Sequence, residues 1–124
     1  MTGTTRYLPE IPGDLPAGSR PMIAIVDAKT GHTRELRAAI EELAAAVRRE
    51  PGCLTFVPYQ DLGTDGRFHL YEIYQDLDAF KDHLQTAHVR KFFDALARHS
   101  TTTAQNLIQL AELDVHSALP TAPT

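Results

Sequence analysis

Three short runs of branched and aromatic residues constrain the fold of this chain more than any other feature of its sequence. They occupy residues 21–29, 53–61 and 67–75, and each run predicts a β-strand. A fourth strand is predicted at residues 104–115, in the run AQNLIQLAELDV. Side chains alternate between the two faces of a strand, yet the first and third runs are apolar on both faces. A sheet made from such strands needs to be covered on both sides.

Two amphipathic helices are predicted between these strands. Residues 33–50 carry apolar side chains at helical spacing, and the Pro51-Gly52 pair ends that helix. Asp76 suits the N-cap of a second helix, whose apolar side extends from Phe80 to Leu96. The order of elements is therefore βαββαβ. This order predicts an α+β fold of the ferredoxin-like type, with a four-stranded antiparallel sheet.

The predicted helices can cover only one face of this sheet. An apolar second face of this size is not expected to stay in water, and pairing with a second copy of the chain would bury it. We therefore predict a homodimer with the two sheets face to face. Residues 21–115 form the predicted domain. Residues 1–20, rich in proline and glycine, are predicted to be an extended leader, and residues 116–124 a loose tail.

Composition and charge exclude several classes of protein. The 12 basic and 16 acidic residues give a net charge of −4, and no basic patch predicts binding to nucleic acid. The apolar runs are too short to cross a bilayer, and residues 1–20 lack the layout of a secretion signal. The single cysteine, Cys53, cannot form an internal disulfide. We expect a soluble cytoplasmic protein with no membrane or nucleic-acid partner.

The candidate catalytic residues are Glu72, Tyr74 and His83. Glu72 and Tyr74 are two apart on the third predicted strand, so their side chains emerge on the same face. His83 lies on the apolar side of the second helix. If that helix packs over the strand, the three groups converge on one pocket, where they could remove a proton from a weakly acidic hydroxyl. In the alternative, structural interpretation, Glu72 forms a satisfied buried pair with His83 or a backbone amide.

Aromatic residues at alternating strand positions and on the helix are predicted to form the wall of this pocket. The predicted substrate contacts are Phe56, Tyr59, Phe80 and His88. The charged residues 48–50 are interpreted as the solvated end of the first helix.

No metal or cofactor site is predicted. His88 follows His83 by five residues, which is about 140° around a continuous helix of 3.6 residues per turn. The two imidazoles would then diverge, and they could not ligate one ion as a pair spaced by four would. The sequence also lacks a glycine-rich phosphate loop and the motifs that bind flavin or nicotinamide.

The sequence resembles the antibiotic biosynthesis monooxygenase family over residues 21–115. The resemblance is carried by EPGCLTF at residues 50–56 and by FHLYEIYQDLDAFKDHLQTAHVRKFF at residues 68–93. It implies a ferredoxin-like fold, a dimeric α/β barrel, and oxygenation of quinols, anthrones or related phenols that often needs no cofactor. By motif, Glu72 matches the strand glutamate of the family, and His83 and His88 match its two helix histidines.

Together these features predict a cofactor-independent monooxygenase that deprotonates a small aromatic substrate and lets it react with O₂. His83 is the expected base or anion partner, Glu72 its orienting group, and Tyr74 a hydrogen-bond donor to the substrate. Two alternatives stay open. The same acid–base groups could serve an isomerase or lyase, or the dimer could bind a small ligand without catalysis.

Overall fold

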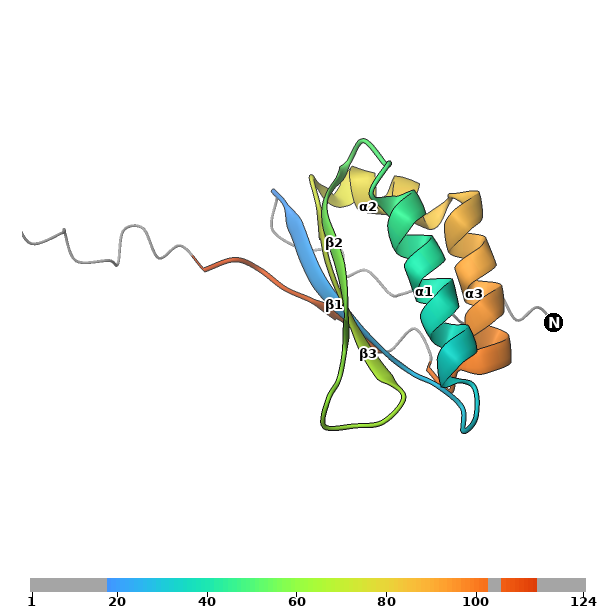
Figure 1. The fold of residues 1–124 in the computed structure, drawn as a ribbon. Helices are drawn as coiled ribbons and strands as arrows, with labels where there is room; N and C mark the ends of the chain where they lie inside the picture. The colour runs from blue at the N-terminus through green and yellow to red at the C-terminus, as the bar shows by residue number, and fades with distance from the viewer. Residues whose placement is uncertain (1–17, 103–105, 114–124) are drawn as a thin grey trace, which may run out of the picture.

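A computed structural model describes residues 18–102 and 106–113. The described elements follow the order β-α-β-β-α-α-β (Figure 1). They are β1 (Arg20–Asp27), α1 (Thr33–Val47), β2 (Cys53–Gln60), β3 (Arg67–Tyr74), α2 (Leu77–Leu84), α3 (Ala87–His99) and β4 (Leu107–Gln109). Residues 1–17 of the predicted leader (1–20) and the predicted tail at residues 116–124 lie outside the described part of the chain, and the last residue of that leader, Arg20, already belongs to β1.

The four strands form one antiparallel sheet in the order β2-β3-β1-β4. This is the ferredoxin-like α+β fold, as predicted. Strand β3 lies in the middle of the sheet, paired with β1 on one side and with β2 on the other. Glu72 is opposite Met22 on β1 and Phe56 on β2, so these three side chains share one face of the sheet.

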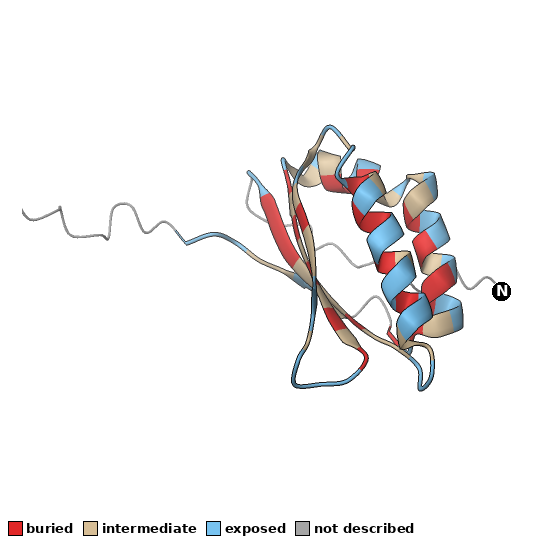
Figure 2. Cartoon of the chain, in the orientation of Figure 1, coloured by how far each residue is buried: buried red, intermediate tan, exposed pale blue. Residues whose placement is uncertain are grey.

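All three helices lie on one side of the sheet (Figure 1). The buried residues gather where the helices face the strands (Figure 2). Helix α1 buries Leu36, Ile40, Leu43 and Val47, which recur at the spacing of one helical face. The core is therefore a single layer of apolar side chains between the sheet and the helices, as the periodicity predicts.

The opposite face of the sheet is also apolar. Ile23, Ile25, Tyr71 and Ile73 alternate with the core residues of β1 and β3 and remain only half-buried, while Ile108 on β4 is 45% exposed. Among the described residues no helix covers this face (Figure 1). The prediction that the strands are apolar on both sides is confirmed.

The second predicted helix is in fact two helices. Helix α2 ends at Leu84, and α3 begins again at Ala87 after the N-cap residue Thr86. The hydroxyl of Thr86 accepts a hydrogen bond from the backbone N–H of Val89 at 3.3 Å and donates one to the carbonyl of His83 at 2.7 Å. A threonine in this position stabilises a new helix start and so allows the chain to change direction. The predicted cap at Asp76 is confirmed, since its carboxylate accepts from Ala79 N–H at 2.8 Å.

The fourth strand is much shorter than predicted. Within the described residues, only Leu107–Gln109 pairs with β1, opposite Met22, Ile23 and Ala24. The remainder of the predicted strand either lies outside the described residues or extends beyond the last pair with β1.

Among the described glycines, Gly52 has the least space for a side chain. A Cβ atom at this position would lie 2.4 Å from the Cβ of Ala79 on α2, and the carbonyl of Gly52 accepts a hydrogen bond from Gln75 N–H at 2.8 Å. Gly52 therefore sets how closely the segment after α1 packs against α2.

We predict that Gly52→Ala lowers the free energy of unfolding by about 1–3 kcal/mol, the usual penalty for overpacking a tight contact. Gly63→Ala is the matched control, because its new Cβ would meet nothing closer than a side-chain oxygen of Asp61 at 3.5 Å. Urea denaturation of both variants checks the prediction. Equal effects of the two substitutions would show that the contact with Ala79 is not tight.

Candidate active site

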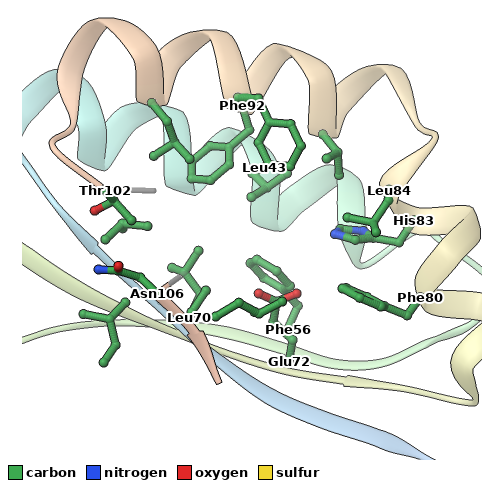
Figure 3. Close-up of a pocket in the computed structure, with 17 residues that line it drawn as sticks. Leu43, Phe56, Leu70, Glu72, Phe80, His83, Leu84, Phe92, Thr102 and Asn106 are labelled. Atoms are coloured by element: carbon green, nitrogen blue, oxygen red, sulfur yellow. The ribbon is translucent and has the colours of Figure 1, made fainter. Parts of the chain in front are cut away.

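An apolar cavity lies between the sheet and the helices. Its volume is about 80 Å³, and its walls come from the four described strands and the three described helices, together with residues before β4 (Figure 3). The apolar walls include Leu43, Phe56, Leu70, Phe80 and Phe92. Glu72 and His83 are the only ionisable residues among the described lining residues. A small molecule in this cavity would meet these two groups in otherwise apolar surroundings.

Glu72 enters the cavity from the sheet. It is only 5% exposed, and one carboxylate oxygen accepts a hydrogen bond from the hydroxyl of Tyr74 at 2.7 Å. Burial raises the pKa of Glu72 to about 6, although the nearby His83 and the bond from Tyr74 act in the opposite direction. Burial and the negative charge of Glu72 also raise the pKa of Tyr74, so this phenol stays protonated. The pair therefore places an acid that titrates close to neutral pH at the floor of the cavity.

His83 enters the same cavity from α2, and its ring points into the space between the sheet and α3 (Figure 3). It is 6% exposed, and its Nδ1 lies 2.9 Å from Oε2 and 3.2 Å from Oε1 of Glu50. An ionised carboxylate can only accept, so the proton of a neutral His83 sits on Nδ1. The lone pair is then on Nε2, which is the tautomer a general base needs.

Glu50 also accepts a hydrogen bond from a second histidine. Nε2 of His88, in the first turn of α3, lies 2.5 Å from the same Oε2 that binds His83. Burial by itself would raise the pKa of Glu50, but the hydrogen bonds and charges of the two histidines outweigh it and hold that pKa below the usual value. Glu50 is therefore an ionised acceptor shared by the two imidazoles.

This arrangement corrects three sequence-based interpretations. His83 and His88 do not diverge, because the break between α2 and α3 turns both toward Glu50. Glu50 is not a solvated helix end, since its side chain is only 11% exposed. The group that orients His83 is Glu50 and not Glu72, because the described hydrogen bonds of His83 Nδ1 all go to Glu50.

The remaining predicted site residues divide into two groups. Phe56 and Phe80 line the cavity as predicted. Tyr59 does not line it: it pairs with His69 on the opposite face of the sheet and is 56% exposed. Tyr74 also lies outside the cavity wall, and its hydroxyl is engaged with Glu72, so it supports Glu72 and does not donate to a substrate.

The sequence pattern of the antibiotic biosynthesis monooxygenase (ABM) family matches residues 22–95, more than half of the chain. The chain belongs to the ABM family. No curated protein shows a significant match to the sequence. The family match contains every group of the site described above, from Glu50 to His88.

Solved structures agree with this assignment. The protein PA3566 from Pseudomonas aeruginosa is 27% identical, with a TM-score of 0.72 over 82% of this chain and 99% of that protein. A candidate ABM from Deinococcus radiodurans is 26% identical, with a TM-score of 0.70 over 77% of this chain and 93% of that one. A candidate ABM from Nitrosomonas europaea, at 24% identity and a TM-score of 0.67 over 77% and 89%, shares the fold. In the described part of this ABM chain, no helix has the length and apolar content needed to cross a bilayer.

Glu50 is the functional residue of this ABM site that sequence reasoning missed. Its signal was present, because Glu50 opens the EPGC motif, and Thr86 is a preferred N-cap residue that could have marked a helix break. The sequence could not show that the side chain of Glu50, which follows α1, contacts residues of both α2 and α3.

The buried Glu72 generates a prediction about stability and pH. Its carboxyl has a pKa of about 6 in the folded chain against an ordinary value of 4.5, so the folded chain binds this proton more tightly than the unfolded chain does. The folded state consequently loses stability as pH rises from about 4.5 through 6. At neutral pH the loss approaches about 2 kcal/mol, from 1.36 kcal/mol for each pKa unit.

We therefore expect Glu72→Gln, which retains an oxygen to accept from Tyr74, to be more stable than the parent at pH 7 by up to about 2 kcal/mol. The advantage should shrink toward pH 4.5. Urea denaturation across this range measures it, with Glu41→Gln as control because the Glu41 side chain is 65% exposed. A difference between variant and parent that does not vary with pH would contradict the burial of an ionised Glu72.

Proposed function

We propose that this ABM-family protein is a cofactor-independent monooxygenase of a small quinol or related phenol. The observation that supports the proposal best is the pairing of a carboxylate-anchored imidazole with a second acid in one apolar cavity. His83 offers a lone pair on Nε2, and the ionised Glu50 stabilises the imidazolium that forms when this lone pair accepts a proton. Such a site can deprotonate a hydroxyl group without help from a metal or flavin.

The apolar walls provide the second requirement of this chemistry. A phenolate that forms among Phe56, Phe80 and Phe92 loses most of its hydration, and its electron density is available to dioxygen. The ring carbon forms a bond to O₂, and the resulting hydroperoxide loses its outer oxygen as water together with the ring hydrogen. A quinol plus O₂ then gives a hydroxyquinone plus H₂O, and the substrate supplies all four electrons.

Glu72 is assigned the second polar contact with the substrate. With a pKa near 6, it exists as both carboxylic acid and carboxylate around neutral pH. In the acid form it can donate to the other oxygen of a quinol, while Tyr74 fixes its orientation from below. Two titratable groups in different environments then have different tasks, with His83 as base and Glu72 as donor.

An isomerase or lyase is the second candidate, and the size of the cavity favours it. The volume of about 80 Å³ is smaller than the cavity of about 150 Å³ that binds benzene in a well-studied protein. An enolisable carbonyl compound of a few atoms would fit without rearrangement, and its enolisation needs the same base. A two-ring quinol or a three-ring anthrone would require the side chains of the wall to move.

Oxygen uptake distinguishes the two candidates. With a panel of one-ring and two-ring hydroquinones, we expect O₂ consumption that matches the amount of hydroxyquinone formed. His83→Ala should reduce this rate at least about 100-fold, the usual contribution of a general base. Glu50→Gln should reduce it by roughly 10–100-fold, because the imidazole loses its anchor.

Glu72→Gln tests whether His83 or Glu72 is the base. The substitution removes the carboxyl group of Glu72 but retains a side chain that can form hydrogen bonds. If His83 is the base and Glu72 the donor, this variant should retain appreciable turnover. Its pH–rate profile should lack the change in rate near pH 6 that the titration of Glu72 causes in the parent. Loss of turnover in Glu72→Gln together with normal turnover in His83→Ala would make Glu72 the base. Turnover of a carbonyl substrate without O₂ uptake would favour the isomerase.

We also propose that the protein acts as a homodimer in which the outer faces of the two sheets meet. The support is the apolar outer face, where Ile23 lies between Tyr71 on β3 and Ile108 on β4. Burying it against an identical face would remove this patch from water.

Ile108→Asp tests the dimer. At 45% exposure the change should be tolerated by one chain alone, but a charge buried between two facing apolar sheets should shift the protein to monomers. Leu62→Asp, at a position 96% exposed in the segment between β2 and β3, is the control and should leave the mass unchanged. Sedimentation equilibrium measures the mass, and a parent protein that is monomeric at all concentrations would contradict the proposal.

A further inference from the structure

Glu50 is the meeting point of three metal-ligating side chains. Its Oε2 lies 2.9 Å from Nδ1 of His83 and 2.5 Å from Nε2 of His88, and one ligand atom from each of the three residues lies within 4.8 Å of the other two. The side chains of Glu50, His83 and His88 are 11%, 7% and 28% exposed. The proposed reaction uses the bond from His83 to Glu50 and leaves the role of His88 open.

Two imidazoles and one carboxylate are a common ligand set for first-row transition ions. Metal–ligand bonds of about 2.0–2.2 Å at angles between about 90° and 109° separate neighbouring ligand atoms by about 2.8–3.6 Å. The contact of Glu50 with His83 already has this spacing. The contact with His88 would open by several tenths of an ångström, and the partly exposed His88 in the first turn of α3 has space to do so.

The surroundings of this cluster attract cations and give them access. A separate open cleft of about 470 Å³ borders Glu50 and His83. The carboxylate residues Asp76, Asp78 and Asp82 also line the cleft, and their negative potential raises the local concentration of divalent cations. His83 is the one described residue that lines both spaces, so an ion can reach its Nδ1 without passing through the cavity.

We propose that Glu50, His83 and His88 bind one divalent first-row transition ion, for which Zn²⁺ is the representative probe. The ion takes the place of the two hydrogen bonds and leaves at least one coordination position for water from the cleft. Binding to Nδ1 of His83 moves the ring proton to Nε2, on the cavity side. An imidazole in this state donates a hydrogen bond but cannot accept a proton, so the bound ion would suspend the action of His83 as a base. This last consequence rests on the proposed function, whereas ion binding itself does not.

The binding test uses the full chain without an affinity tag, after removal of metals with a chelator. Titration with Zn²⁺ in a calorimeter should show one strong site per chain, and Co²⁺ should give a visible absorption spectrum that Zn²⁺ abolishes. His88→Ala and Glu50→Gln should each weaken binding by at least about tenfold, the lower limit found when even an indirect partner of a metal is lost. If Glu50→Gln does not fold, the test rests on His88→Ala alone, because His88 is partly exposed and its replacement should be tolerated.

His69→Ala is the matched control. His69 is also paired with a carboxylate, at 2.8 Å from Asp61, but no third ligand in the described residues joins that pair. This variant should bind Zn²⁺ as the parent does. Absence of a stoichiometric site, affinity unchanged in both His88→Ala and Glu50→Gln, or equal loss in His69→Ala would overturn the proposed metal site.

A separate measurement tests the consequence for activity. Zn²⁺ should inhibit turnover at concentrations that match its dissociation constant, and excess chelator should restore the rate. Tight binding without inhibition would support the metal site and refute His83 as the base. Turnover with no Zn²⁺ binding would support the proposed function and refute the metal site, so the two failures are distinguishable.

Discussion

The carboxylate of Glu50 and its two hydrogen bonds with histidines organise the site. A charge that is largely removed from water must be compensated, because an unpaired buried carboxylate costs several kcal/mol. Here the compensation comes from His83, which is 33 residues away in the sequence, and from His88, which is 38 residues away. The bonds connect the segment after α1 to both α2 and α3. They fix the position of the His83 ring by electrostatics, in a region where α2 contributes only Phe80 and His83 to the buried residues.

The two acids of the site differ because their partners differ. Glu50 has two hydrogen-bond donors that can carry positive charge, and its pKa lies below the usual value. Glu72 has one neutral donor, Tyr74, and burial dominates, so its pKa rises to about 6. His83 lies between these acids and interacts with both. Under the proposed function, one carboxylate that stays ionised and another that titrates near pH 6 suit proton transfer in an apolar cavity. The stability that the buried Glu72 costs would then be a cost of that function.

The sequence predicts the fold well and the site in part. Alternation in β3 puts Glu72 and Tyr74 on one face of the sheet, and the helical spacing of α2 puts Phe80 on its apolar side, so these placements follow from local pattern alone. The prediction that Tyr59 lines the cavity together with Phe56 fails for a local reason, because the two residues are three apart on β2 and regular alternation puts them on opposite faces. The contacts of Glu50 depend on the angle between α2 and α3. That angle arises from the cap at Thr86, and periodicity cannot reveal it because both helices continue the same apolar stripe.

The size of the cavity limits which substrates this site can accept. On the sheet side, Phe56 and Leu70 belong to strands that are fixed by hydrogen-bonded ladders, and the central strand β3 has a neighbour on each edge. On the helix side, Leu84 and Phe93 are only partly buried and lie at the edge of the core. Expansion is therefore easier toward the helices than toward the sheet, because fewer packed contacts oppose it. Under the proposed function, such an enlarged cavity leaves Glu72 in place on the sheet while the helix side adjusts. The substrate oxygen that Glu72 contacts should therefore be selected more strictly than the rest of the substrate.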